Sequence, residues 1–237
     1  MGGTITLTQP RHGYRAGMDA GLLAAACQRH GPLRIIEAGC GVGAALLQVA
    51  ARNREAQLTG LERDEQAVAL ARANADDNAM GERVRIVRGD VAHGFRALGE
   101  PAFDLALCNP PYFDDETKLR APAPERRGAW IADDGLGAWL GFLLKAVREG
   151  GEIVIIHRAE RLADILAGLA PKAGSFMIRP VHPHDDAPAK RVIVRAVKTG
   201  RAPLTLLPAL VMHTREGARH TPQAEAILRG ERALEWR

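Results

Sequence analysis

The sequence predicts an α/β protein built on a mostly parallel β-sheet with helices on both faces. Short apolar runs rich in β-branched residues alternate with segments whose apolar residues recur at helical spacing, between residues 33 and 170. Parallel strands that are buried on both faces read as continuous apolar runs of this kind. Two further runs near the C-terminus are joined by a polar loop too short for a crossover helix, which predicts an antiparallel hairpin.

Seven segments are expected to be strands, because each is a short β-rich run that ends in turn or polar residues. The five parallel strands are 33–39, 56–62, 83–90, 103–109 and 151–157. The two hairpin strands are 175–181 and 191–197, with the polar loop "HPHDDAPAK" between them.

Helices are expected between most of these strands. Two aspartates are candidate N-caps, Asp19 for a helix over residues 22–27 and Asp64 for a helix that runs to Ala75. Apolar residues also follow one helical face in 136–147 and in 162–169.

The chain of 237 residues is long enough for one domain with a sizeable core. We expect an N-terminal arm and helix (1–32), a main domain (33–200) and a C-terminal extension (201–237) that packs on the same domain. The extension is expected to add a strand and a closing helix.

Composition narrows the class of protein only a little. The formal net charge of +4 suits an anionic partner such as nucleic acid, although many unrelated proteins are mildly basic. Three cysteines without C-x-x-C spacing indicate neither a disulfide framework nor a zinc site. No apolar run approaches the roughly 18 residues of a membrane span, and the N-terminus lacks the apolar core of a secretory signal. A cytoplasmic protein without membrane or metal partners is expected.

A glycine-rich turn, "EAGCGVG", follows the first predicted strand and opens a helix at about Val42. Gly39, Gly41 and Gly43 allow a tight turn and let a ligand approach the backbone beside the free N–H groups of a helix N-terminus. The spacing differs by one residue from the G-x-G-x-x-G of dinucleotide-binding proteins. A turn used only for packing would look the same.

Two acids end the next two strands. Glu62 lies nineteen residues after Gly43, where a carboxylate can accept hydrogen bonds from both ribose hydroxyls. Asp90 ends the third strand in "RGDV" and is a candidate for an adenine amino group. A helix-capping or solvated acid is the alternative for Glu62, and a strand-end turn is the alternative for Asp90. Together with the glycines they lie at the carboxyl edge of adjacent strands, where open α/β sheets bind ligands.

The motifs "EAGCGVG", "GLERD", "RGDV" and "NPPY" together resemble those of the Rossmann-like S-adenosylmethionine-dependent methyltransferases. The resemblance implies a class I methyltransferase fold with a seven-stranded sheet whose last strand pair is a reversed hairpin. It implies S-adenosyl-L-methionine as the cofactor. The implied binding residues are Glu37, Gly39, Cys40, Gly41 and Gly43 at the methionine end, Glu62 and Arg63 at the ribose, Asp90 and Val91 at the adenine, and Asn109 beside the sulfonium.

The candidate catalytic residues are Asn109, Pro110, Pro111 and Tyr112. An exocyclic amine on an aromatic ring is a poor nucleophile, because its lone pair is delocalised. The carboxamide oxygen of Asn109 and the carbonyl of Pro110 can each accept one N–H bond and so free that lone pair for attack on a methyl group. The prolines hold both acceptors in place, and Tyr112, with Phe113, can stack on a planar substrate. An Asn-Pro turn that merely ends a strand is the alternative.

This motif resembles that of amino-methyltransferases that act on adenine N6, on some cytosine and guanine amino groups, and on protein glutamine. The segment 9–26 further resembles the N-terminal part of bacterial tRNA(Val) adenine-37 N6-methyltransferases, and places Tyr14, Arg15 and Asp19 near the cofactor. The alternative that Asp19 only caps a helix stays open. About thirty residues precede the first strand, too few for the helical substrate domain usual in release-factor glutamine methyltransferases.

The same resemblance places two groups of cations near the mouth of the pocket, where they could contact the phosphates of an RNA partner. They are Lys118, Arg120, Arg126 and Arg127 after the catalytic motif, and Lys190, Arg191 and Arg195 in the hairpin. His182, His184, Asp185 and Asp186 read as a polar hairpin loop rather than a metal site. We therefore expect methyl transfer to adenine N6 in RNA, and specifically in tRNA. The alternatives are a protein glutamine-N5 methyltransferase and a catalytically silent RNA-binding module.

Overall fold

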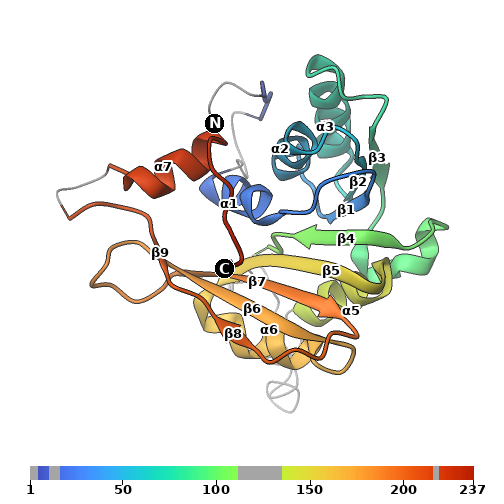
Figure 1. Ribbon diagram of the computed structural model, residues 1–237. Coiled ribbons are helices and arrows are strands. Elements are labelled where there is room, and N and C mark those ends of the chain that lie inside the picture. The colour runs from blue at the N-terminus through green and yellow to red at the C-terminus, as the bar shows by residue number, and fades with distance from the viewer. Residues whose placement is uncertain (1–4, 11–16, 112–134, 216–218) are drawn as a thin grey trace, which may run out of the picture.

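A central β-sheet carries helices on both faces, as the sequence predicts (Figure 1). The structure is a computed structural model and describes residues 5–10, 17–111, 135–215 and 219–237. Within these ranges the sheet has nine strands: β1 (Arg34–Ala38), β2 (Gln57–Glu62), β3 (Val84–Arg88), β4 (Phe103–Cys108), β5 (Val147–Arg158), β6 (Ala173–His182), β7 (Arg191–Lys198), β8 (Thr205–Leu206) and β9 (Leu210–Val211).

Seven of these strands, in the order β3-β2-β1-β4-β5-β7-β6, form the sheet that the resemblance implies. The first five are parallel, and β7 runs antiparallel to both β5 and β6, so the predicted hairpin is confirmed. The C-terminal extension adds two strands rather than one. Both β8 and β9 pair with β6, which covers part of an edge that would otherwise expose backbone hydrogen-bonding groups.

The described helices are α1 (Met18–Ala26), α2 (Ala44–Arg52), α3 (Glu65–Asp77), α5 (Leu136–Ala146), α6 (Leu162–Leu169) and α7 (Pro222–Arg229). The predicted cap of α3 is confirmed, since the Asp64 side chain accepts a hydrogen bond from the Ala67 N–H. The predicted cap of α1 is wrong: Gly17 is the N-cap, and Asp19 lies in the first turn.

Two other boundaries differ from the sequence prediction. The helix after the glycine turn begins at Ala44 rather than Val42, because Gly43 is left-handed (φ 87°) and serves as its N-cap. Val147 begins β5 instead of ending α5, so this strand starts four residues earlier than expected. Val147 is β-branched, and its apolar side chain fits either a helix end or a buried strand.

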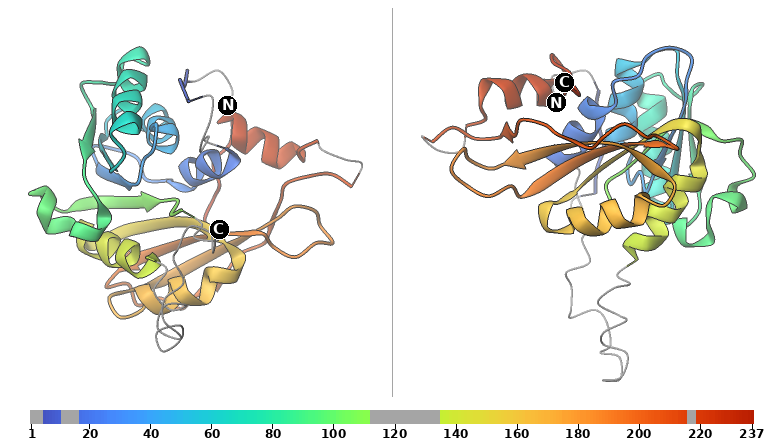
Figure 2. Two further views of the ribbon diagram at one scale, coloured as in Figure 1. Left: turned by 180° about the vertical axis from the view of Figure 1, so that it is seen from behind. Right: turned by 60° about the horizontal axis from the view of Figure 1, so that its bottom comes forward.

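The core has two halves, one on each face of the sheet (Figure 2). Ile35 of β1 packs in the half that contains α1, α2 and α3, and its neighbour Ile36 packs in the half that contains α5 and α6. Between β3 and β4 the chain forms two 3-10 helices, η1 (Val91–His93) and η2 (Phe95–Leu98). The ring of Phe95 meets Phe103 and Phe142 edge-on, with centroids 6.0 and 5.9 Å away.

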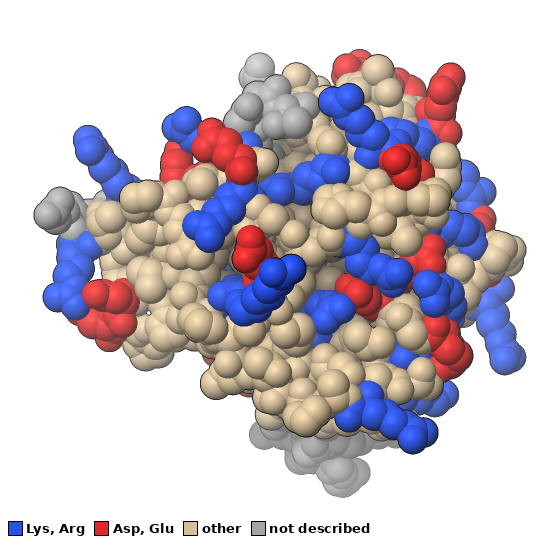
Figure 3. All heavy atoms as spheres, viewed as in Figure 1, with Lys and Arg blue, Asp and Glu red and all other residues tan. Residues whose placement is uncertain are grey.

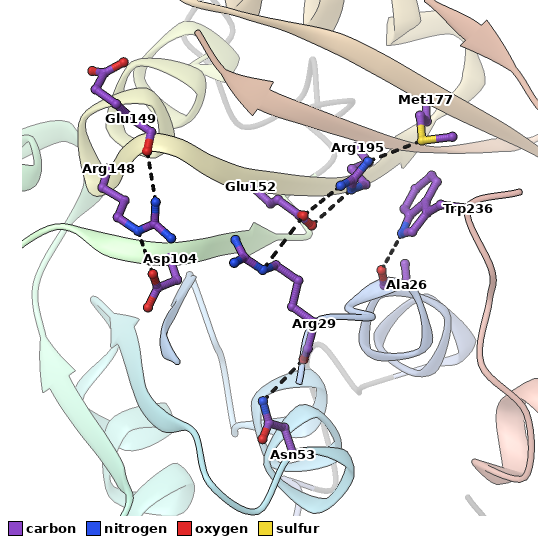
Figure 4. Close-up of polar contacts among 10 residues, drawn as sticks. All are labelled: Ala26, Arg29, Asn53, Asp104, Arg148, Glu149, Glu152, Met177, Arg195 and Trp236. Atoms are coloured by element: carbon purple, nitrogen blue, oxygen red, sulfur yellow. Dashed lines mark hydrogen bonds and ion pairs between the residues drawn. The ribbon is translucent and has the colours of Figure 1, made fainter. Parts of the chain in front are cut away.

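A polar network fastens the segment after α1 to the sheet (Figure 4). The carboxylate of Glu152 on β5 accepts two hydrogen bonds from the Arg195 guanidinium, at 2.7 and 3.0 Å. Arg29, which follows α1, lies 4.0 Å from the same carboxylate. At the other side of α1, the indole N–H of Trp236 donates to the Ala26 carbonyl at 2.8 Å. Helix α1 is therefore held by β5, β7 and the C-terminal residues.

We expect Glu152→Gln to lower the free energy of unfolding by about 1 to 2 kcal/mol, because it removes the charge of a carboxylate that is only 12% exposed and bonds Arg195 twice. Denaturant unfolding measures the change. The matched control is Glu160→Gln, whose carboxylate is 67% exposed and pairs with Arg158 at 3.5 Å. That control should change stability by less than about 0.5 kcal/mol. Equal losses in the two variants would contradict the anchoring role of Glu152.

Candidate active site

The hydrogen-bonded register brings the ends of the parallel strands to one edge of the sheet. Ala38, the last residue of β1, pairs with Leu61 of β2 on one side and with Cys108 of β4 on the other. The residues that follow these three are therefore neighbours at the carboxyl edge. They are Gly39, Glu62 and Asn109.

The glycine turn has the left-handed backbone that its sequence suggests. Gly39, Gly41 and Gly43 have φ values of 66°, 53° and 87°, which side chains with a Cβ adopt only at a cost. The N–H of Cys40 donates to the Leu61 carbonyl at 3.0 Å, so the turn is bonded to the end of β2 as it leaves β1.

The carboxylate of Glu62 holds this turn in place. Its Oε2 accepts a hydrogen bond from the Gly41 N–H at 2.9 Å. Its Oε1 accepts from the N–H groups of Arg63 and Asp64, at 2.8 and 2.9 Å. An ionised carboxylate has about four acceptor positions, so three backbone donors leave room for a further hydroxyl donor. The ribose role of Glu62 stays a prediction, and the structure adds a second role in shaping the turn.

The next strand end carries the acid assigned to the adenine. Asp90 accepts a hydrogen bond from the Ala92 N–H at 2.9 Å and so caps η1. Its other oxygen lies 3.8 Å from the guanidinium of Arg63, whose side chain is 75% exposed. Val91 is buried in the core half that contains α5. The capping role that explains Asp90 alone is thus present, and adenine contact by Asp90 and Val91 stays a prediction.

Glu37 is a buried acid on β1, only 3% exposed. Burial raises the pKa of its carboxyl well above the usual range; the Leu46 N–H acts in the opposite direction, and the nearby Glu62 carboxylate raises it further. Its Oε2 is buried and has no hydrogen-bond partner among the described residues. A buried carboxyl with an unused oxygen, two residues before the first glycine of the turn, fits the ammonium of a bound amino-acid moiety.

The cysteines at this edge are not nucleophiles. Burial, with the nearby Glu37 carboxyl adding to it, raises the pKa of both Cys40 and Cys108 well above the usual range. Only a thiolate attacks readily, so these thiols are unreactive. Cys40 instead packs its sulfur against Gly60 of β2, where a Cβ would come within 2.6 Å of it.

Trp139 of α5 lies at this site, although the sequence pattern predicts only that it lies on the apolar face of a helix. A Cβ built on Gly39 would lie 2.3 Å from the indole Cη2 atom, so the ring occupies the space beside the turn. The indole is partly buried against the α5 half of the core. A tryptophan in an otherwise aliphatic helical stripe was the only signal, and it does not say which strand the ring meets.

The candidate catalytic motif begins inside the described part of the chain and continues outside it. Asn109 is partly buried, Pro110 is buried and Pro111 is exposed. The other substrate and catalytic candidates between β4 and α5 lie outside the described residues: Tyr112, Phe113, Lys118, Arg120, Arg126 and Arg127, together with Tyr14 and Arg15 near the N-terminus.

Two candidates that the sequence treated separately are in contact. The Arg191 guanidinium of β7 donates to the Asp19 carboxylate of α1 at 3.0 Å, with side chains 25% and 13% exposed. Arg195 is bound to Glu152, whereas the Lys190 side chain is exposed. Among the hairpin cations, Lys190 is therefore better placed than Arg195 for phosphate contact. Arg191 links the hairpin to the N-terminal helix.

A groove of about 830 Å³ lies away from this edge, along β3, where Arg34, Arg72 and Arg85 line it. We place the candidate site at the carboxyl edge instead, because the glycine turn, the buried Glu37 and Asn109 of the candidate catalytic motif meet there. No three His, Cys, Asp or Glu side chains in the described part of the chain are arranged to hold a metal ion. In the same part of the chain, no helix is both long and apolar enough to cross a membrane.

Comparison with known proteins agrees with this geometry. Residues 15–123 match the model of the methyltransferase small domain family. A tRNA1(Val) (adenine(37)-N6)-methyltransferase of Vibrio cholerae is 30% identical over 190 residues, which cover 78% of this chain and 72% of that protein. The enzyme of the same name from Haemophilus influenzae is 29% identical over 143 residues, 60% of each chain. A release factor glutamine methyltransferase of Shewanella oneidensis is 32% identical over 57% of this chain and 49% of its own length.

Solved structures show the same fold. A protein of Agrobacterium tumefaciens described as a predicted O-methyltransferase superimposes with a TM-score of 0.76 and 29% identity, over 91% of this chain and 98% of its own. TrmN from Thermus thermophilus superimposes with a TM-score of 0.55 and 17% identity, over 76% of this chain and 48% of that one. This second likeness concerns the fold alone.

The fold and the site define a class I, S-adenosylmethionine-dependent methyltransferase architecture. The chain belongs to the methyltransferase family that includes the tRNA1(Val) (adenine(37)-N6)-methyltransferases. The matched regions span 44%, 60% and 46% of the length of three of these curated relatives.

We expect Glu37→Gln to stabilise the protein at pH 8 more than at pH 5. The carboxyl of the unfolded chain ionises near pH 4.3, whereas the folded chain keeps its proton to a higher pH, so wild-type stability falls as the pH rises between these two values. Glutamine does not titrate, so the stability difference between variant and wild type should grow by roughly 1 kcal/mol per pH unit in that window.

Denaturant unfolding at the two pH values measures this difference, and calorimetry should show weaker binding of S-adenosylmethionine to the same variant. Glu65→Gln is the control, because the Glu65 side chain is 76% exposed. An effect of Glu37→Gln that is the same at pH 5 and pH 8 would contradict a protonated carboxyl in the free protein.

We expect Gly39→Ala to lower the free energy of unfolding by about 2 to 4 kcal/mol, since alanine is strained at a left-handed φ and its Cβ overlaps the Trp139 ring. Gly137→Ala in α5, with nothing within 4 Å of the new Cβ, should instead be neutral or stabilising by up to about 1 kcal/mol. Trp139→Leu should recover part of the loss in the Gly39→Ala background. A double-mutant cycle without coupling would show that the two residues do not meet.

Proposed function

We propose that the protein transfers a methyl group from S-adenosylmethionine to the exocyclic N6 amine of an adenine in tRNA. The observation that carries this proposal is the position of Asn109 directly after Cys108, whose register partner on β1 is Ala38, the residue before the glycine turn. The acceptors of the catalytic motif thus lie beside the turn that belongs to the cofactor site. The bound cofactor would supply an electrophilic methyl group on a sulfonium.

The residues of this chain have three tasks in that reaction. Glu37 and the N–H groups of the glycine turn would hold the amino-acid end of the cofactor, and Glu62 the ribose. The Asn109 carboxamide oxygen and the Pro110 carbonyl would accept the two N–H groups of the amine, which localises the nitrogen lone pair for attack. In this reaction an N–C bond would form as the S–C bond breaks, and the amine would lose a proton to water afterwards. Neither Cys40 nor Cys108 takes part.

The choice of substrate rests on the relatives. Curated proteins named for tRNA1(Val) adenine-37 match up to 78% of this chain. A release factor glutamine methyltransferase also matches, over 57% of the chain, so glutamine in a protein is the second candidate. Its chemistry uses the same acceptors for an amide nitrogen. A tRNA substrate would place the enzyme in the cytoplasm.

Incubation with labelled S-adenosylmethionine and either total tRNA or a release factor protein distinguishes these candidates. We expect label in tRNA as N6-methyladenosine. Label in the protein would establish the glutamine alternative, and label on a hydroxyl would support the chemistry named for the Agrobacterium structure. A chain that binds tRNA but transfers no label would be the catalytically silent module.

We expect Asn109→Ala to lower kcat by at least about 100-fold, the scale usual for a preorganised polar contact to a transition state. Asn109→Asp keeps an acceptor oxygen at the same position and should lose less. Calorimetry with S-adenosylhomocysteine should show that both variants still bind the cofactor product. Full activity of Asn109→Ala would overturn the proposed role of this residue.

A further inference from the structure

Two segments from different parts of the chain form an arm at the carboxyl edge of the sheet. One is the loop 183–190 between β6 and β7, and the other comprises residues 212–215 and 219–221, between β9 and α7. We call these segments the histidine arm. Its loop extends away from the helical layers in the views of Figures 1 and 2. Because β6 and β9 run parallel to each other and in the direction of β5, the arm lies at the same edge as Asn109.

Three imidazole rings meet in the arm. The ring of His213 lies 5.1 Å from His220 at an interplanar angle of 23°, a stacked arrangement, and 5.7 Å from His184 at 43°. His213 and His220 also form a backbone bridge, and the Thr214 N–H donates to the Arg219 carbonyl at 3.1 Å. His213 is therefore the middle ring, and His184 and His220 are the end rings.

Polar contacts hold the two segments of the arm together. The Arg215 guanidinium donates three hydrogen bonds of 2.8 to 3.1 Å to the Asp185 carboxylate, which connects the segments. The His213 N–H donates to the Pro183 carbonyl at 2.9 Å. His220 Nδ1 lies 3.1 Å from the Glu225 carboxylate of α7. The ring Nδ1 of His213 has no hydrogen-bond partner among the described residues, so ring contacts rather than polar bonds position this imidazole.

The charge of the arm does not by itself recruit a polyanion. Asp185 and Asp186 offset the nearby arginines, and the face in Figure 3 carries Lys and Arg interspersed with Asp and Glu. What distinguishes the arm is its rings. Three of the eight histidines of the chain gather at the edge where substrate must approach. Single-stranded RNA is recognised largely by stacking of unpaired bases on such rings, histidine included.

We propose that the histidine arm binds the RNA substrate by stacking an unpaired base on an end ring, His184 or His220. This inference rests on the proposed function for its partner. Three inter-strand steps separate β4 from β6, which puts the arm about 14 Å or more from Asn109. An unpaired base a few nucleotides away from the target adenine in a loop can reach the arm while the target enters the catalytic site. The arm thus gives the C-terminal extension a role in substrate selection.

The test compares tRNA binding by His184→Ala and His220→Ala with wild type, using fluorescence anisotropy of a labelled tRNA. Each variant is expected to raise Kd by at least about fivefold, the lower end for loss of one stacked base. The dependence of log K on log salt should keep its slope, because no phosphate contact is lost. His30→Ala is the matched control, since His30 is exposed and precedes β1 at the opposite edge.

Two further measurements exclude a folding defect. His184→Phe and His220→Phe keep a flat ring and should retain most of the affinity. Calorimetry with S-adenosylhomocysteine should give the wild-type Kd for every variant. Wild-type tRNA affinity in both alanine variants would overturn the role of the arm even if methylation is confirmed. If the wild-type protein binds tRNA but methylates protein instead, the proposed function fails, and the binding comparison still decides the role of the arm.

Discussion

The register of β1 between β2 and β4 is the constraint on which the rest of the site depends. With Ala38 paired to Leu61 and Cys108, the glycine turn, the Glu62 carboxylate and Asn109 must emerge side by side. A shift of one residue in either neighbour would turn its side chains to the other face and separate these groups. The apolar residues of β1 are distributed between two core halves, so burial on both faces resists such a shift.

The turn itself is held from two sides by unlike interactions. Glu62 bonds its backbone from β2, and the Trp139 ring fills the space beside Gly39 from α5. Glu37 instead destabilises the fold, because a buried carboxyl oxygen without a hydrogen-bond partner costs folding free energy. A rigid turn beside a carboxyl oxygen that lacks a hydrogen-bond partner is typical of a site that binds a cationic ligand. Stability and ligand binding are therefore in competition at Glu37.

Local patterns in the sequence predicted the elements well, and contacts between elements poorly. The seven principal strands, the reversed hairpin and the Asp64 cap follow from periodicity and capping chemistry within a few residues. The Trp139 contact and the Asp19–Arg191 pair depend on packing between helices and strands distant in sequence, which no local pattern encodes. Strands β8 and β9 have two residues each, too short for any periodicity. Asp19 looked like a cap because its side-chain type is right, but a glycine two residues earlier takes that position.

The anchoring of α1 has a consequence for the order in which the molecule can fold. This helix leaves the ribosome well before its partners: Arg191 lies 172 residues beyond Asp19, and Trp236 lies 210 residues beyond Ala26. Until those residues are synthesised, the apolar surface of α1 has only part of its cover, and closing such long loops is slow. The parallel sheet can assemble earlier, around β1, β2 and β4. The glycine turn would then form before α1 gains its contacts with the C-terminal residues.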